Sequence, residues 1–107
     1  MDALIFQTLS DPTRLQLVEA LRSGECAVGD LVARVDIKQS GVSRHLRILH
    51  EAGLVQVRPD GQRRLYSLCP QPFLDLDAWL AGYRAVWESR LDRLGAQLSL
   101  PQQERRS

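Results

Sequence analysis

Residues 39–64 place a helix with two different faces directly before a basic β-hairpin, and no other part of the chain constrains the fold as strongly. On a 3.6-residue period, Val42, Leu46 and Leu49 share one apolar face. The opposite face is polar and carries Ser40, Ser43, Arg44 and Arg47. Such a helix packs one side on a core and presents the other to solvent or to a partner.

The polar face has the side chains that a DNA-recognition helix needs. Arginine can donate two parallel hydrogen bonds to guanine, and serine can reach phosphates or base edges in the major groove. A solvated face without a partner is the alternative, because short polar stripes are common on surface helices. The segments on both sides of this helix favour DNA binding.

These flanking segments predict a helix-turn-helix over residues 29–52. Residues 29–38 have the pattern of a short helix followed by a turn, and residues 40–52 form the second, recognition helix. Gly53 predicts the end of that helix, because glycine readily adopts the left-handed conformation after a last helical turn.

Residues 54–69 predict a β-hairpin, the wing. Residues 54–57 (LVQV) alternate like a half-buried strand, Asp60-Gly61 predicts a tight turn, and residues 63–68 (RRLYSL) return as a second strand. The arginines expected at the tip are Arg58, Arg63 and Arg64.

Positive charge is concentrated in this part of the chain. Residues 38–64 contain six Lys and Arg against two Asp and Glu, a net charge of +4, and the other residues contain eight against eleven, a net charge of −3. A local basic patch on a near-neutral protein favours double-stranded DNA as the partner. The predicted DNA contacts are Gln39, Ser40, Ser43, Arg44, His45, Arg47, Arg58, Gly61, Arg63 and Arg64. His45 lies at the edge of the apolar face, where it could bind a phosphate or only pack.

Both ends of the chain predict helices with more apolar surface than one small domain can bury. Residues 1–9 are a short helix candidate, Asp11 and Pro12 open the next helix as N-cap and first residue, and residues 73–98 carry apolar residues every three or four positions. The surplus fits a two-fold interface between two copies of the chain. The expected interface residues are Leu4, Ile5, Leu80, Tyr83, Trp87, Leu91 and Leu94.

Length and composition predict one domain. A chain of 107 residues, 44% of them hydrophobic, can build one small core, so we expect a single domain over residues 1–99 and a flexible tail over residues 100–107. No charged N-terminal segment precedes an apolar run, and no stretch approaches the ~20 apolar residues that span a bilayer. We therefore expect a cytoplasmic protein without a membrane partner.

Several motifs carry a resemblance to a known family. They are LSDPTRLQLVEAL (9–21), CAVGDL (26–31), SGVSRHLRILHEAGLV (40–55), DGQRRLYSL (60–68) and YRAVWESRLDRL (83–94). Together they resemble the ArsR/SmtB (arsenic-repressor) family of bacterial transcriptional repressors. The resemblance implies a mainly α-helical winged helix-turn-helix with a small β-hairpin, whose N- and C-terminal helices form a homodimer interface. It also implies binding to a near-palindromic operator and release when an inducer binds.

The sequence departs from that family at its metal-sensing positions. Family members that sense soft metals carry two cysteines in an ELCVCDL stretch, and alignment on Asp30-Leu31 places Ala27 and Gly29 at both positions. Members that sense zinc use Asp, His and Glu of the last helix, and residues 73–98 contain no histidine. We expect no metal site and no cofactor.

Two cysteines keep another mode of regulation open. Cys26 falls in a short segment of the kind that pairs with the second wing strand, and Cys69 ends that strand, so the thiols could be neighbours. A repressor that responds to oxidants or thiophilic metals is therefore an alternative to two small core residues. An organic inducer that binds near Trp79, Tyr83 and Trp87 is a further alternative mode of regulation.

Two other classes of function remain. A winged helix that binds protein would keep the apolar surfaces but has little use for a face with Ser43, Arg44 and Arg47 or for a basic wing. An enzyme is not expected, because the sequence has no Gly-rich phosphate loop, no nucleophile elbow and no paired histidines.

Overall fold

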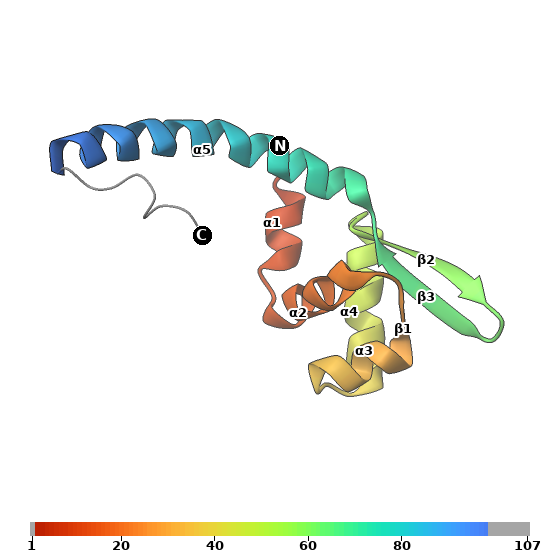
Figure 1. Cartoon of the computed structure of the whole chain (residues 1–107). Helices are drawn as coiled ribbons and strands as arrows, with labels where there is room; N and C mark the ends of the chain where they lie inside the picture. The colour runs from red at the N-terminus through yellow and green to blue at the C-terminus, as the bar shows by residue number, and fades with distance from the viewer. Residues whose placement is uncertain (1, 99–107) are drawn as a thin grey trace. The chain divides into compact units, whose positions relative to one another are not determined.

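The computed structural model describes residues 2–98, and for residues 96–98 it describes the backbone only. The elements are α1 (Leu4–Leu9), α2 (Pro12–Ala20), the 3₁₀ helix η1 (Leu21–Ser23), β1 (Cys26–Ala27), α3 (Val28–Val35), α4 (Gln39–Glu51), β2 (Val55–Asp60), β3 (Arg63–Leu68) and α5 (Pro70–Leu98) (Figure 1). A mainly α-helical chain with a small β-hairpin is confirmed. The tail expected at residues 100–107 lies outside the described residues. The chain forms two compact units that divide after Phe73, and each is described by itself.

Helix α2 begins where its N-cap predicts. The Asp11 side chain accepts hydrogen bonds from the N–H groups of Thr13 at 2.8 Å and Arg14 at 3.1 Å. Pro12 occupies the first turn, where no N–H has an intrahelical acceptor. The α-helix ends at Ala20, and η1 tightens the chain before Gly24, whose φ is 131°.

Helices α3 and α4 form the predicted helix-turn-helix. Asp36 ends α3 in the left-handed conformation, with φ 50° and ψ 46°. Helix α4 begins and ends one residue earlier than expected, and its apolar face is confirmed because Val42, Leu46 and Leu49 are completely buried. Other core residues are Leu17, Leu31, Leu54 and Val55.

Gly53 ends α4 with a Schellman motif. Its φ is 79°, and its N–H donates to the His50 carbonyl at 3.0 Å. The next N–H, of Leu54, donates to the Leu49 carbonyl at 3.0 Å. Both leucines are buried, which is the apolar contact that accompanies this motif. The motif ends the recognition helix and starts the wing.

The wing belongs to a three-stranded antiparallel sheet in the order β1-β3-β2. The turn lies one residue later than predicted: Asp60 still belongs to β2 and pairs with Arg63, so Gly61 and Gln62 form the two-residue loop. Gly61 has a φ of 62° and Gln62 does not have a positive φ, which is the pattern of a type II′ turn with glycine first.

Helix α5 begins at Pro70, three residues earlier than predicted. Pro70 and Pro72 both lie in its first turn, where proline removes no intrahelical hydrogen bond. Within residues 2–98, none of the helices combines the length and the apolar composition that crossing a membrane demands.

Candidate nucleic-acid interface

The polar face of α4 is exposed along its whole length. Its exposed members are Gln39, Ser40, Ser43, Arg44 and Arg47. Within the described part of the chain, Arg44 makes no ion pair, whereas Arg47 Nε lies 3.9 Å from Glu51 Oε1. Both side chains of that pair are about 70% exposed, so water and salt weaken it. Arg44 is thus the guanidinium of this face that is available to a base edge.

Close packing joins the turn of the helix-turn-helix to the start of α4. A Cβ built on Gly41 would lie 3.1 Å from Ile37 Cγ2, which is closer than most side chains tolerate. The first N–H groups of α4 have no side-chain cap from Lys38. These orphan donors and the positive end of the helix dipole favour a phosphate nearby.

His45 is half-buried and lies at the edge of the recognition face. Its Nδ1 lies 3.5 Å from Nη1 of Arg14. Arg14 Nε also donates to the Thr8 carbonyl at 2.6 Å. This contact engages Nδ1, and phosphate binding by the other ring nitrogen, Nε2, stays a prediction. Sequence reasoning missed Arg14 as its neighbour, because the two residues are 31 positions apart.

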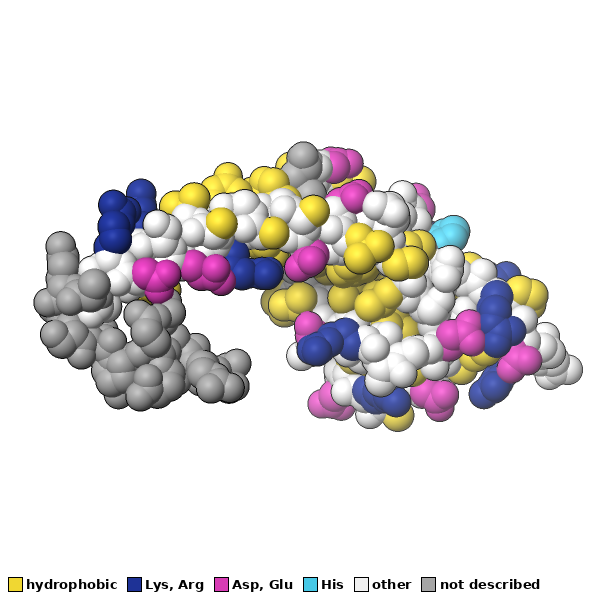
Figure 2. All heavy atoms as spheres, turned by 45° about the horizontal axis from the view of Figure 1, so that its top comes forward, with side chains coloured by type: hydrophobic (Ala, Val, Ile, Leu, Met, Phe, Trp, Pro, Cys, Tyr) yellow, Lys and Arg dark blue, Asp and Glu magenta, His cyan; other side chains and the backbone are white. Residues whose placement is uncertain are grey.

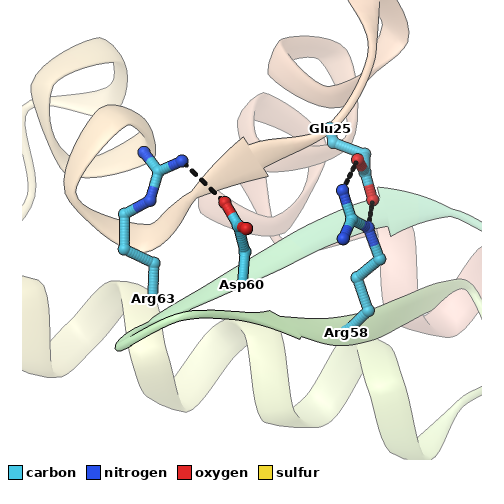
Figure 3. Close-up of polar contacts among 4 residues, drawn as sticks. All are labelled: Glu25, Arg58, Asp60 and Arg63. Atoms are coloured by element: carbon cyan, nitrogen blue, oxygen red, sulfur yellow. Dashed lines mark hydrogen bonds and ion pairs between the residues drawn. The ribbon is translucent and has the colours of Figure 1, made fainter.

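Arg58 does not lie at the tip of the wing, which corrects the prediction. It lies two residues before the end of β2, and its guanidinium makes two hydrogen bonds to Glu25 (Figure 3). Nε donates to Oε2 at 2.7 Å and Nη2 donates to Oε1 at 2.9 Å. These hydrogen bonds hold the pKa of the Glu25 carboxyl below its ordinary value and raise the pKa of Arg58. Glu25 lies 33 positions before Arg58, so no local pattern in the sequence indicates this pair.

The tip of the wing carries Arg63, Arg64 and Gly61. Arg63 Nη2 donates to Asp60 Oδ2 at 2.9 Å, across the last residue pair of the hairpin (Figure 3). Arg64 is exposed and makes no ion pair among residues 2–98. Because side chains alternate along a strand, Arg64 lies on the opposite face of the hairpin from Arg63.

The expected neighbourhood of the two cysteines is wrong. Cys26 pairs with Tyr66, and Cys69 follows Tyr66 by three residues. Three extended residues span ~10 Å, whereas a disulfide needs Cα atoms within ~4.4–6.8 Å. The reason is that β1 pairs with the middle of β3 and not with its end. Within one chain, Cys26 is a buried and Cys69 a half-buried thiol.

Helix α1 exposes one of the two apolar residues that were expected in the dimer interface. Ile5 is only 5% exposed and therefore belongs to the core, which removes it from the expected dimer interface. Leu4 and Phe6 are 43% and 44% exposed. A six-residue helix gives too short a pattern to tell these faces apart in the sequence.

Helix α5 carries a long exposed apolar stripe (Figure 2). Its exposed members are Leu74, Trp79, Leu80, Tyr83, Val86, Trp87, Leu91 and Leu94. The rings of Trp79 and Tyr83 make an edge-to-face contact with centroids 4.9 Å apart, and the Arg90 guanidinium lies 5.6 Å from the centroid of Trp87. All the residues of α5 named for the dimer interface are thus exposed in the single chain.

The described part of the chain contains no set of ligands for a metal ion. Between residues 2 and 98, no three His, Cys, Asp or Glu side chains gather in a group that could hold an ion.

Comparison with known proteins gives one consistent result. The family model described as "Bacterial regulatory protein, arsR family" matches residues 11–57. The "HTH-type transcriptional regulator Rv2034" of Mycobacterium tuberculosis is 39% identical over 95 residues, which cover 81% of this chain and 89% of the relative. The "Transcriptional repressor SdpR" of Bacillus subtilis is 30% identical over 79 residues, 74% of this chain and 88% of the relative. The crystal structure of the "transcriptional repressor BigR from Xylella fastidiosa" has a TM-score of 0.64 and 34% identity, covering 76% of this chain and 83% of that one.

Proposed function

Because the chain belongs to the arsR family of bacterial regulatory proteins and is a DNA-binding transcriptional regulator rather than an enzyme, we propose that it is a homodimeric repressor that reads one operator half-site with each α4. The observation that carries this proposal is the division of α4 into two faces. One face is completely buried, and the other presents Ser40, Ser43 and the guanidinium of Arg44, which makes no ion pair among residues 2–98. A helix held this firmly by its apolar face can present its polar face to the major groove in one orientation.

The side chains divide into two roles in this proposal. Arg44 donates to a guanine and so discriminates between bases, with Gln39 and Ser43 beside it on the same face. Arg64 at the wing and the uncapped start of α4 bind phosphates and so position the domain. Arg63, Arg47 and Gly61 lie at the rim of this surface, where the two arginines are partly neutralised by Asp60 and Glu51.

The dimer is proposed from the exposed apolar surface. Leu4 and Phe6 of α1, and the stripe of α5, expose more large apolar side chains than a small monomer leaves in water. A two-fold axis would bury these surfaces against their copies in a partner chain. It would also place two α4 helices on successive turns of the same DNA face, ~34 Å apart or a multiple of that.

The inducer is proposed to be something other than a metal bound at the family's thiolate pair. Ala27 and Gly29 stand at those two positions, and neither side chain can ligate an ion. An organic molecule that stacks on Trp79, Tyr83 or Trp87 fits the aromatic content of α5 better. Because Cys26 and Cys69 are separated within one chain, no observation supports a switch through an intrachain disulfide.

Selection of bound duplexes from a random library, followed by sedimentation of the complex, tests the proposal. We expect a near-palindromic sequence to be enriched and two chains to bind each duplex, with affinity that falls steeply as salt rises. A protein that enriches no sequence, or whose binding to duplex DNA does not depend on salt, would instead support a module for protein interaction.

A further inference from the structure

The Glu25–Arg58 ion pair joins two strands that are not neighbours. In the order β1-β3-β2, β3 lies between Arg58 in β2 and Glu25, which directly precedes β1. Leu65 of β3 pairs with both Arg58 and Ala27, and Glu25 is two residues before Ala27. Side chains two residues apart in a strand share a face, so the two charged groups meet on one face of the sheet (Figure 3).

The second ion pair of the wing lies on that same face. Asp60 follows Arg58 by two residues in β2, and it pairs with Arg63 directly across the hairpin. Figure 3 shows both pairs above the same side of the hairpin ribbon. Of the three wing arginines, therefore, two are neutralised by carboxylates of this chain, and Arg64 on the other face has no ion pair among the described residues.

The Glu25–Arg58 pair and the Asp60–Arg63 pair differ in their number of hydrogen bonds. Glu25 accepts from two different nitrogens of Arg58, and such bidentate bonds between charged groups are shorter and stronger than single ones. The Glu25 side chain is also 37% exposed, less than those of Glu19, Glu51, Asp60 and Asp77, which also pair with arginines. The raised pKa of Arg58 and the lowered pKa of Glu25 have this contact as their main cause. A DNA phosphate would have to break both hydrogen bonds to engage these nitrogens.

We propose that Glu25 limits the affinity of the wing for DNA of any sequence, because it holds the Arg58 guanidinium on one face of the sheet and withholds one positive charge from sequence-independent binding to phosphates. The inference rests on the proposed DNA binding by α4 and the wing. Attraction to phosphates raises affinity for every sequence equally, whereas base contacts by Arg44 favour the operator alone. A wing with fewer unpaired charges therefore lowers the affinity for operator and random duplexes by the same factor, and the ratio of the two affinities is left to the base contacts of Arg44. The same pair ties β1 to the wing, where β1 itself contributes only two residue pairs.

The test measures the affinity of the full chain for a random-sequence duplex and for the selected operator over a range of salt concentrations. The variants are Glu25→Gln, Arg58→Gln and the double variant. Glu19→Gln is the matched control, because it also removes one carboxylate and releases one arginine, Arg22, from an ion pair of 3.0 Å in a helical segment outside the wing.

We expect Glu25→Gln to bind the random duplex more tightly, with a salt slope that is steeper by about one unit per bound chain. Its affinity for the operator should rise by the same factor, so that the ratio of operator to random affinity stays that of the parent. Arg58→Gln and the double variant should keep the parent's salt slope, because Arg58 contributes no phosphate contact while Glu25 holds it.

Two results would overturn the inference. The first is a salt slope of Glu25→Gln that equals the salt slope of Glu19→Gln. The second is a salt slope of Arg58→Gln that is shallower than the parent's by about one unit, because it would show that Arg58 leaves Glu25 for a phosphate. The second result does not depend on the folding of Glu25→Gln. A parent protein that binds neither duplex would contradict the proposed function itself and is thereby distinguished from both.

Discussion

The Arg14 guanidinium lies 3.5 Å from Nδ1 of His45 and so joins α2 to the recognition helix α4. Arginine has no acceptor, so Nδ1 must accept in this contact, which places the proton of a neutral imidazole on Nε2. The same guanidinium donates to the Thr8 carbonyl near the end of α1. One side chain therefore connects three helices, and one of these is the helix that we propose to enter the DNA groove.

Replacement of Arg14 by Gln should lower the free energy of unfolding by about 1 kcal/mol, because the Thr8 carbonyl loses its charged donor. It should also weaken operator binding, since the orientation of α4 is no longer held from α2. Urea denaturation and a DNA titration measure the two effects. Arg22→Gln is the control, because Arg22 is exposed and contacts only Glu19 in the described residues. Equal stability and equal affinity of the two variants would contradict a positioning role for Arg14.

Replacement of Arg44 by Ala should cost ~1–3 kcal/mol of operator binding and relax the preference at one base pair, because a bidentate contact to guanine is lost. Arg64→Ala should instead weaken binding to all duplexes alike and flatten the salt slope by about one unit per chain. Titrations of the operator, of single-base variants of it and of a random duplex separate the two effects. If a folded Arg44→Ala protein binds the operator as tightly as the parent, the proposal that α4 reads the operator is contradicted.

Local signals account for the parts of the fold that the sequence predicts. The Asp11-Pro12 cap, the glycine at position 53 and the faces of α4 all depend on residues within a few positions of one another. The backbone geometry that they need is therefore visible in a short stretch of sequence. The same holds for the hairpin, although its turn lies one residue later than expected.

Contacts between distant segments account for the parts that could not be predicted. The pairing of Arg58 with Glu25 depends on how β1 meets β3, and so does the separation of Cys26 from Cys69. No periodicity in the sequence sets the register of a two-residue strand. The burial of Ile5 is a similar case, since only the packing of α1 on its neighbours decides which side of such a short helix is covered.

Stability at acidic pH should depend on Asp11. The N–H groups of Arg14 and Thr13 donate to its carboxylate and hold its pKa below the ordinary value of 3.8. The folded protein therefore binds fewer protons at Asp11 than the unfolded chain does. The stabilisation is complete well above pH 3.8 and is lost as the pH falls through the lower, folded pKa.

The measurement is the Tm of the parent and of Asp11→Asn between neutral and acidic pH. Asparagine can still cap the helix but carries no charge, so the Tm difference between the two proteins should shrink as the pH falls below 3.8. A constant difference between the parent and Asp11→Asn over the whole range would contradict the assignment.

Replacement of Leu91 by Glu should separate the proposed dimer. Leu91 is 46% exposed in the single chain and belongs to the apolar stripe of α5, so a charge there would be buried without a partner in a two-fold interface. In a sedimentation experiment, we expect the parent to have twice the mass of one chain and Leu91→Glu to have the mass of one chain. Operator affinity should fall strongly, because one recognition helix then binds only one half-site.

Ser89→Glu is the matched control for Leu91→Glu. It adds the same charge two residues away, which is about 200° around the helix, and it should keep the dimer and its operator affinity. A parent that sediments as a single chain at micromolar concentration and still binds the full operator tightly would show that α5 has another partner.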